Sequence, residues 1–433
     1  MSVVRSHSDD STGYIALIRG NANFRSLWSG QIVSLLGDWF NLIASASLVA
    51  ELTESGLAVG GLFVVRMLAP FMVSPMAGVA ADRYSRKRLL ILADLGRAIT
   101  VLGFLLVRDA QHVWLLFALT AVQLAISGFF FPARNAILPD IVSQGQLGTA
   151  NALSSATWSV MLALGAALGG VVAGGWGIYP AFVIDAFSFL FSALLIARIN
   201  YTSHPATMAV SPGGTLGVAL RQYTEGLQYV RQHSDILVIA LHKAAFALAA
   251  SGPLQVIQVV LAEQVFVIGE GGGTGLGLMY AVAGVGTGLG PIIARRFTGD
   301  RDRSLRVAIA LSYAIAALGL GMVAPLSSFD LVLLGTLLRA IGGGIGWVFS
   351  TQLLLNLVPN HVRGRVFSTE FALFTLLNAV GAAAGGWALE SASIEISEIV
   401  WWMTGLTLVP GVLWTLWIAV GQRTTQFEME RKS

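Results

Sequence analysis

Eight ionisable residues of this chain lie inside long apolar runs. They are Asp38, Arg66, Asp94, Arg97, Asp185, Lys243, Arg339 and Glu370. A charge in apolar surroundings is costly unless it has a partner, contacts water or performs a function. Proton transfer, substrate binding and structural ion pairing are therefore the roles to weigh for each of them.

Asp38 lies about midway along the apolar run 27–50. A lone carboxylate at such a position is suited to taking up and releasing a proton, as a proton-driven carrier requires. The alternative is a structural hydrogen bond to a neighbouring helix. Arg66, near the middle of the run 57–81, is either a counter-charge that tunes this acid or a member of a packing ion pair.

Asp94 and Arg97 are three residues apart, about one helical turn, so they are predicted to pair with each other. Asp94 also follows a basic loop, and we expect it to help hold Arg83 or Arg86 near the end of its helix. Structural roles are favoured for both Asp94 and Arg97.

Asp185 is predicted either to make a structural polar contact or to belong to a substrate site. His242 and Lys243 fall within another run and either face a cavity, where they would meet an anionic or polar substrate, or, for the lysine, point to the membrane interface.

Arg339 and Glu370 have more ordinary expected roles. Arg339 precedes a glycine-rich stretch and is predicted to serve helix packing. Glu370 is predicted to pair with Arg363 or Arg365.

Composition places these charges in a membrane protein. Of 433 residues, 55% are hydrophobic and 11% charged, with a mean hydropathy of +0.74, whereas soluble domains carry about 25% charged residues. The apolar runs are continuous and long enough for spanning helices, unlike the alternating segments of a β-barrel. The polar region 1–24 lacks the pattern of a cleavable signal peptide.

The sequence predicts an all-α membrane protein of about twelve transmembrane helices in two pseudo-symmetric six-helix bundles. The expected spans are 27–50, 57–81, 88–108, 112–133, 147–174, 178–197, 236–262, 274–294, 304–325, 330–355, 366–388 and 399–421. The predicted organisation is an N-terminal tail 1–24, a bundle 25–198, a central loop 199–235, a second bundle 236–421 and a tail 422–433.

Charged residues are distributed unequally between the two sets of loops. The loops on the side of the N-terminus hold Arg83, Arg86, Lys87, Arg88, Arg198, Arg221, Arg231, Arg295, Arg296, Arg301, Arg303, Arg306, Arg363 and Arg365. The opposite loops hold Arg108 among nine acids: Glu51, Glu54, Asp109, Glu263, Glu270, Asp330, Glu390, Glu395 and Glu398. By the positive-inside rule, both termini are predicted to be cytoplasmic, in a bacterial-type inner membrane.

The two halves contain matching segments. The run Gly165-Ala-Ala-Leu-Gly169-Gly170 matches Gly381-Ala-Ala-Ala-Gly385-Gly386, and Pro139-Asp140 matches Pro359-Asn360. Gly78 matches Gly290, each at the end of a span. The matches occur in the same order in both halves, which indicates a six-plus-six duplication, an arrangement found in transporters.

Other function classes lack their signatures. The chain has no cysteine, which excludes disulfides and thiol chemistry. It has neither a Gly-x-x-x-x-Gly-Lys-Ser/Thr loop nor a His-Glu-x-x-His pair. Its basic residues lie in membrane-proximal loops. We therefore expect no enzyme activity, cofactor, metal or nucleic-acid partner.

The loop Gly78-Val-Ala-Ala-Asp82-Arg83-Tyr84-Ser85-Arg86-Lys87-Arg88 resembles the signature loop of the major facilitator superfamily, with Ser85 where that loop usually has Gly. Further segments resemble its drug/proton antiporter branch, which includes macrolide and siderophore exporters: Asn23-Phe24-Arg25, Ser34-Leu-Leu-Gly37-Asp38, Pro132-Ala-Arg134-Asn-Ala-Ile-Leu-Pro139-Asp140 and Arg363-Gly364-Arg365. Together these segments extend over nearly the whole chain.

The resemblance implies a cytoplasmic gate formed by Gly78, Asp82, Arg83, Arg86 and Asp94. Within it, Asp82 would contact the N-terminal end of the eleventh span, where the helix dipole favours an anion. Enforcement of topology is the alternative role of the basic residues.

The glycines Gly165, Gly169, Gly170, Gly381 and Gly385 are predicted to serve helix packing. The resemblance ties the first of these motifs to antiporters, and its usual proline is missing here. Close backbone contact of Gly165, Gly169, Gly170 and Gly174 across the halves would let the two halves rock against each other.

The leading hypothesis is proton-coupled efflux of a hydrophobic or amphipathic small molecule by alternating access, with Asp38 and Arg66 in proton coupling. A lysophospholipid transporter that is not driven by protons is the first alternative. A membrane-embedded enzyme or receptor scaffold is an alternative of another class. The expected partners are membrane lipid, protons and the transported molecule, and we expect a monomer.

Overall fold

The computed structural model describes residues 13–201, 224–225, 227–299, 301–391 and 394–432. Within these ranges it consists of helices and their connections, without a strand. Twelve of the described helices are long and apolar enough to cross a membrane. The all-α prediction with about twelve spans is therefore confirmed.

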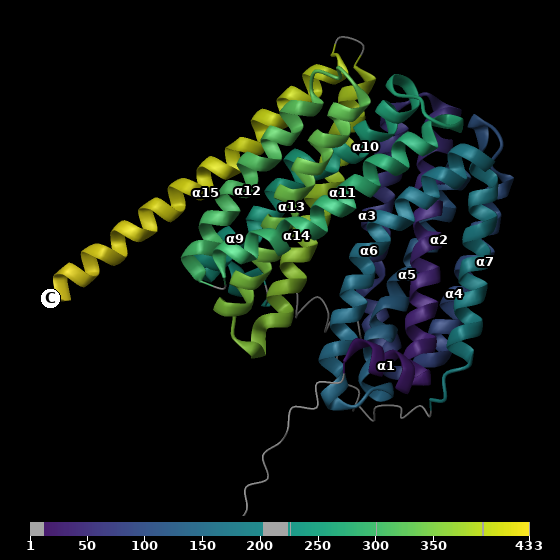
Figure 1. Ribbon diagram of the computed structural model, residues 1–433, viewed down its shortest axis with the longest axis horizontal. Coiled ribbons are helices and arrows are strands. Elements are labelled where there is room, and N and C mark those ends of the chain that lie inside the picture. Colours follow the sequence, from purple (N-terminus) through teal and green to yellow (C-terminus); the bar gives the residue numbers. More distant parts are fainter. Residues whose placement is uncertain (1–12, 202–223, 226, 300, 392–393, 433) are drawn as a thin grey trace, which may run out of the picture.

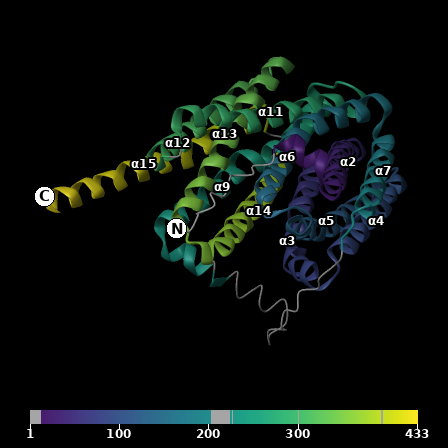
Figure 2. The same cartoon turned by 60° about the horizontal axis from the view of Figure 1, so that its bottom comes forward.

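The twelve spans form two bundles that lie side by side (Figures 1 and 2). The first bundle contains α2 (Ala22–Thr53), α3 (Gly56–Arg83), α4 (Arg86–Gly103), α5 (Val113–Ile141), α6 (Gln144–Trp176) and α7 (Ile178–Ala197). The second contains α9 (Ser234–Phe246) and α10 (Gly252–Val260), which share one span, with α11 (Gly273–Thr298), α12 (Asp302–Val323), α13 (Phe329–Leu357), α14 (Asn360–Glu390) and α15 (Ile396–Lys432).

Both ends of the chain contain more helix than the sequence predicted. A short helix, α1 (Tyr14–Gly20), precedes the first span and packs through Leu17, which is fully buried. Asn21 separates the two helices and caps α2, because its side-chain oxygen accepts a hydrogen bond from the Phe24 amide at 2.9 Å. At the other end, α15 continues past the predicted limit of 421 to Lys432 and projects from the bundle (Figure 1).

The two matching glycine motifs have equivalent packing roles in the two halves. Gly165 and Gly169 face Trp39 and Phe40 on α2, the first span of their own half. Gly381 and Gly385 likewise face the first span of the second half, at Leu248 and Pro253. At each of these positions a Cβ atom would lie about 2.7 to 3.1 Å from its nearest neighbour, so a larger side chain would separate the helices. These four glycines therefore pack helices within one half, and the prediction of contact across the halves is wrong for Gly165 and Gly169.

The last glycine of each motif does make contact across the halves. A Cβ atom on Gly170 of α6 would lie 2.6 Å from the Cα atom of Gly277 on α11. A Cβ atom on Gly386 of α14 would lie 2.6 Å from the carbonyl oxygen of Gly56 on α3. The duplication is therefore visible in packing, because equivalent glycines form the two equivalent contacts between the bundles.

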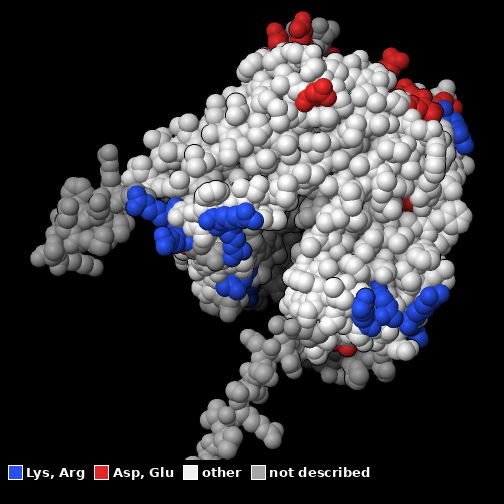
Figure 3. Space-filling model, in the orientation of Figure 1, with Lys and Arg blue, Asp and Glu red and all other residues white. Residues whose placement is uncertain are grey.

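The charged side chains gather at the two ends of the molecule (Figure 3). We call the lower end in this view, where lysines and arginines gather, the basic end, and the opposite one the acidic end. The space-filling surface is hollowed between the two halves, and this cleft opens toward the basic end (Figure 3). Near the acidic end the halves are in contact, and the Ser55 hydroxyl donates a hydrogen bond to the Glu390 carboxylate at 2.9 Å.

Candidate functional site

A buried ionic cluster lies in the first half around the guanidinium group of Arg97, which is 2% exposed. Arg97 forms a direct ion pair with Asp94 one turn earlier on α4, as the spacing predicted. The guanidinium carbon also lies 4.5 Å from the ring centre of Phe130 and 4.1 Å from that of Phe189. These rings of α5 and α7 stabilise the buried cation through their faces.

Asp38 on α2 approaches the same guanidinium group, with its Oδ2 atom 3.9 Å from Nη1 of Arg97. Its side chain is 28% exposed, whereas that of Asp94 is fully buried. Because Asp94 already neutralises Arg97, Asp38 is not required to balance the arginine. Asp38 is thus the accessible carboxylate of a cluster that remains paired without it.

Asp185 on α7 is also fully buried and lies within electrostatic range of Asp38. Gly37 permits this approach, because a Cβ atom there would overlap the side chains of Asp185 and Ser188. The Ser188 hydroxyl donates to the Asp185 carbonyl oxygen at 2.7 Å. The sequence left Asp185 as a structural contact or a substrate residue, and its complete burial favours the structural contact.

A second ion pair lies in the other half, between Lys243 on α9 and Glu370 on α14. The Lys243 ammonium lies 2.8 Å from Oε1 of Glu370 and donates a hydrogen bond to the Thr351 hydroxyl at 2.7 Å. It also lies 4.3 Å from the ring centre of Trp347. The predicted pairing of Glu370 with an arginine of the preceding loop is wrong. Arg363 donates to the carbonyl oxygens of Leu355 and Val358, and Arg365 pairs with Glu225. Glu370 points instead into the bundle, where a buried cation is available.

His242 points away from this ion pair, although it is the neighbour of Lys243. Its Nδ1 atom lies 2.6 Å from the Tyr313 hydroxyl on α12, and its ring centre lies 5.2 Å from that of Trp414 on α15. Adjacent residues of a helix point about 100° apart, so the two side chains enter different parts of the bundle. The environment of His242 is that of a packed core residue.

The residues of the expected gate are distributed differently from the prediction. Arg86 forms an ion pair with Asp140 at 2.6 Å and not with Asp94, which is directed to Arg97 inside the half. The Tyr201 hydroxyl donates to the same Asp140 carboxylate at 2.9 Å. Burial, assisted by this hydrogen bond, raises the pKa of the Tyr201 phenol, so it remains a donor at neutral pH.

Gly78, Asp82 and Arg83 belong to the last turns of α3, but their side chains lie outside the described part of the structure. Their gate role stays a prediction.

Three ionisable groups interact electrostatically across the two halves. Tyr280 on α11 is 8% exposed and lies within electrostatic range of Arg66 on α3 and Arg339 on α13. Arg66 also lies within electrostatic range of Asp38, which favours the counter-charge over the packing ion pair among the roles predicted for this arginine. Its ring centre lies 5.8 Å from that of Trp39, the residue after Asp38. Sequence reasoning did not single out Tyr280, although a phenol in a long apolar run is a signal of the same kind as a buried charge.

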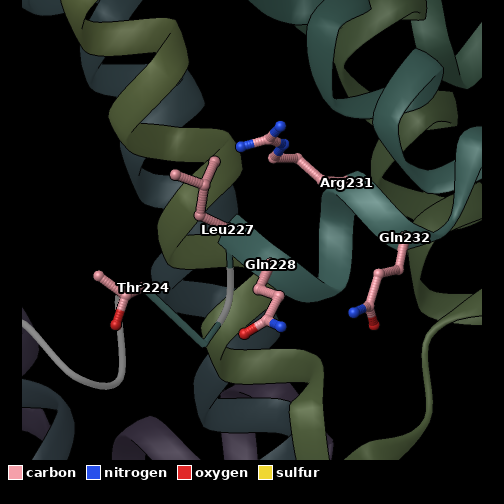
Figure 4. A pocket seen from close by; sticks show the side chains of 5 residues that line it. All are labelled: Thr224, Leu227, Gln228, Arg231 and Gln232. Carbon is pink, nitrogen blue, oxygen red and sulfur yellow. The ribbon is translucent and has the colours of Figure 1, made fainter.

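Two cavities lie outside this group. One, of about 310 Å³, is lined by residues of α6, α11, α12 and α13, including Ala156, Thr287 and Gln352. The other, of about 410 Å³, is lined by Thr224, Leu227, Gln228, Arg231 and Gln232, all from one short segment (Figure 4). Neither contains one of the eight ionisable residues of the apolar runs.

A sequence profile of the Major Facilitator Superfamily matches residues 27–369 of the chain. The chain belongs to this superfamily. Among curated superfamily members, the uncharacterized MFS-type transporter YfiS of Bacillus subtilis is 27% identical over 397 residues, covering 89% of this chain and 91% of the relative. The putative bacilysin exporter BacE of Bacillus subtilis is 23% identical and covers 83% and 87% of the two chains.

Macrolide efflux protein A of Streptococcus pyogenes is 20% identical, covering 89% of this chain and 93% of the relative. Solved structures of the superfamily have the same fold. The crystal structure of the nucleoside transporter NupG matches with a TM-score of 0.73 and 12% identity over 91% of this chain and 99% of its own. A bacterial homologue of the iron transporter ferroportin, in an inward-facing state, matches with a TM-score of 0.67 and 15% identity over 91% and 98% of the two chains. The chain is therefore a superfamily transporter that has efflux proteins among its relatives.

Proposed function

We propose that this transporter exports a small molecule in exchange for protons, with Asp38 as the proton carrier. The observation that carries the proposal is the difference in exposure among three neighbouring carboxylates. Asp94 and Asp185 are fully buried, whereas the Asp38 side chain is 28% exposed. Asp38 therefore has access to water or substrate that the other two lack.

The pairing of Arg97 supports this role. A proton carrier must exist in two charge states without destabilising its surroundings. Since Arg97 keeps its ion pair with Asp94 in both states, Asp38 can bind or lose a proton at a limited cost. A basic or polar substrate that approaches Asp38 would displace the proton and couple the two movements.

The arrangement of the two halves supports alternating access. The halves touch through closely packed glycines on α6 with α11 and on α3 with α14, and the cleft opens at the basic end (Figure 3). The positive-inside rule assigns the basic end to the cytoplasm. On this assignment the cleft faces the cytoplasm and is ready to accept a molecule for export.

The test is an efflux assay in cells with ethidium, a macrolide, the dipeptide phenylalanyl-phenylalanine and a lysophospholipid, with and without a protonophore. Asp38→Asn removes the carrier but keeps a polar side chain of the same size. Asp109→Asn is the matched control, because Asp109 has an exposed side chain and pairs with His112 in a loop. We expect protonophore-sensitive efflux in the native chain and in Asp109→Asn, and none in Asp38→Asn.

Efflux that survives both the protonophore and Asp38→Asn, in protein expressed at the native level, would refute proton coupling through Asp38. If the lysophospholipid alone were moved under those conditions, the lipid-transporter alternative would replace the proposal.

A further inference from the structure

Two arginines, one from each half, have no carboxylate within 4 Å in the described part of the chain, although Asp38 and Asp185 act on Arg66 from a longer range. Arg66 lies on α3 and Arg339 on α13, and both are half-buried. The Nη1 atom of Arg66 and the Nε atom of Arg339 are buried without a hydrogen-bond partner. Lys243 and Arg97, in contrast, each form an ion pair with a carboxylate.

Tyr280 brings these two arginines into one group. Its hydroxyl lies within electrostatic range of both guanidinium groups. This hydroxyl is buried and has no hydrogen-bond partner among the described residues, although the side chain is more than nine-tenths buried. A buried phenol hydroxyl without a partner and two guanidinium groups that each have an unpaired buried nitrogen are costly in a membrane protein.

The three groups share one kind of chemistry. Guanidinium groups donate hydrogen bonds and accept none, and they match the two oxygens of a carboxylate or a phosphate. A phenol hydroxyl can donate to the same acceptor. A single acidic group would therefore supply a counter-charge in direct contact and the missing hydrogen-bond acceptors together.

We propose that Arg66, Tyr280 and Arg339 form the subsite for an acidic group of the transported molecule. The substrate is accordingly not a simple hydrophobic cation. Because the arginines belong to different halves, an acidic group bound between them attracts both halves at once and favours closure around the substrate.

The charge of the rest of the substrate follows from exchange with protons, and this second step rests on the proposed function. A purely anionic substrate would favour protonation of the nearby Asp38, so proton and substrate would move together. Exchange requires the opposite, a basic group that replaces the proton at Asp38. The substrate class is therefore amphoteric, with its acidic group at the arginines and its basic group at Asp38.

The chain offers a direct test because it has no cysteine. Tyr280→Cys introduces a single thiol between the arginines, and its modification rate is measured with two methanethiosulfonate reagents, one carrying a sulfonate and one a trimethylammonium group. The quantity compared is the modification rate with the anionic reagent divided by the rate with the cationic reagent. We expect this ratio to be about tenfold higher for Tyr280→Cys than for a free thiol in solution, since two nearby positive charges attract one reagent and repel the other. Adding Arg339→Gln should reduce this preference by about fivefold.

Thr298→Cys is the matched control on the same helix. Thr298 is the last residue of α11 and lies eight residues, about 12 Å of helix, beyond Gly290, which packs against Ile341 near Arg339. Its reagent ratio should not change with Arg339→Gln, because this separation exceeds the screening length at physiological salt. The subsite proposal is refuted if Tyr280→Cys reacts faster with the cationic reagent, or if adding Arg339→Gln leaves the reagent ratio unchanged.

A protection experiment on Tyr280→Cys identifies the source of the acidic group. Three probes are compared. The dipeptide phenylalanyl-phenylalanine carries a carboxylate, its C-terminal amide carries no acidic group, and lysophosphatidylcholine carries a phosphate. We expect an acid-bearing probe to slow modification at least fivefold, with the amide having no effect. Equal protection by the amide, or no protection by any probe, contradicts the inference.

This reactivity does not depend on proton coupling, so the two proposals fail separately. If Asp38→Asn left efflux intact while the reagent ratio at Tyr280→Cys had the expected value, the acidic subsite would be supported and proton coupling through Asp38 would be refuted.

Discussion

The ion pair of Lys243 with Glu370 gives the most direct test of the energetics inside the second half. The two charged atoms lie 2.8 Å apart, and the side chains are 4% and 5% exposed. At an effective dielectric constant of about 20, two unit charges at this distance attract each other by about 6 kcal/mol, most of which offsets their loss of hydration. Glu370→Gln removes the anion and leaves the ammonium with the Thr351 hydroxyl and the Trp347 ring.

We expect Glu370→Gln to lower the free energy of unfolding by about 3 kcal/mol, the lower limit for breaking a buried ion pair, because the Thr351 hydrogen bond and the Trp347 ring compensate in part. The measurement is equilibrium unfolding of the purified full chain in mixed micelles. Lys243→Met combined with Glu370→Gln removes both charges and should restore most of the loss.

The control is the ion pair of Arg365 with Glu225, in which the two atoms lie 2.9 Å apart and the side chains are 42% and 35% exposed. Glu225→Gln makes the same chemical change at nearly the same distance, but in contact with water, and should cost less than about 1 kcal/mol. Equal losses from Glu370→Gln and Glu225→Gln would refute the argument from burial. So would a double variant that is no more stable than Glu370→Gln alone.

The contact between the halves yields two further predictions. Gly170→Val should reduce transport at least tenfold with the protein still folded, because its Cβ atom would lie 2.6 Å from Gly277 Cα. Gly175→Val is the control in the same efflux assay, because a Cβ atom there would meet no neighbouring atom within 4 Å. Ala173→Cys combined with Gly273→Cys should form a disulfide on oxidation, because the two Cβ atoms would lie about 3.1 Å apart, close to the usual range. This crosslink should stop efflux until a reductant is added, and undiminished efflux by the crosslinked protein would contradict alternating access.

The sequence alone determined the class of protein and its organisation. Continuous apolar runs, the scarcity of charge and the repeated glycine motifs were sufficient to predict twelve spans in two related bundles. These features are local or periodic, so they do not depend on which helices meet. The pairing of Asp94 with Arg97 was predictable for the same reason, because both residues lie on one helical turn.

Only the tertiary structure decided which distant residues form the sites. Nothing in the chain order shows that Glu370 meets Lys243, or that Arg66 and Arg339 both lie within electrostatic range of Tyr280. Each of these contacts depends on how a helix is rotated about its axis and on which helices lie next to it. A difference of about 100° in direction moves a side chain to another environment, as the adjacent residues His242 and Lys243 demonstrate. Periodicity identifies the apolar faces of a helix but does not specify its neighbours, and in a membrane almost every face is apolar.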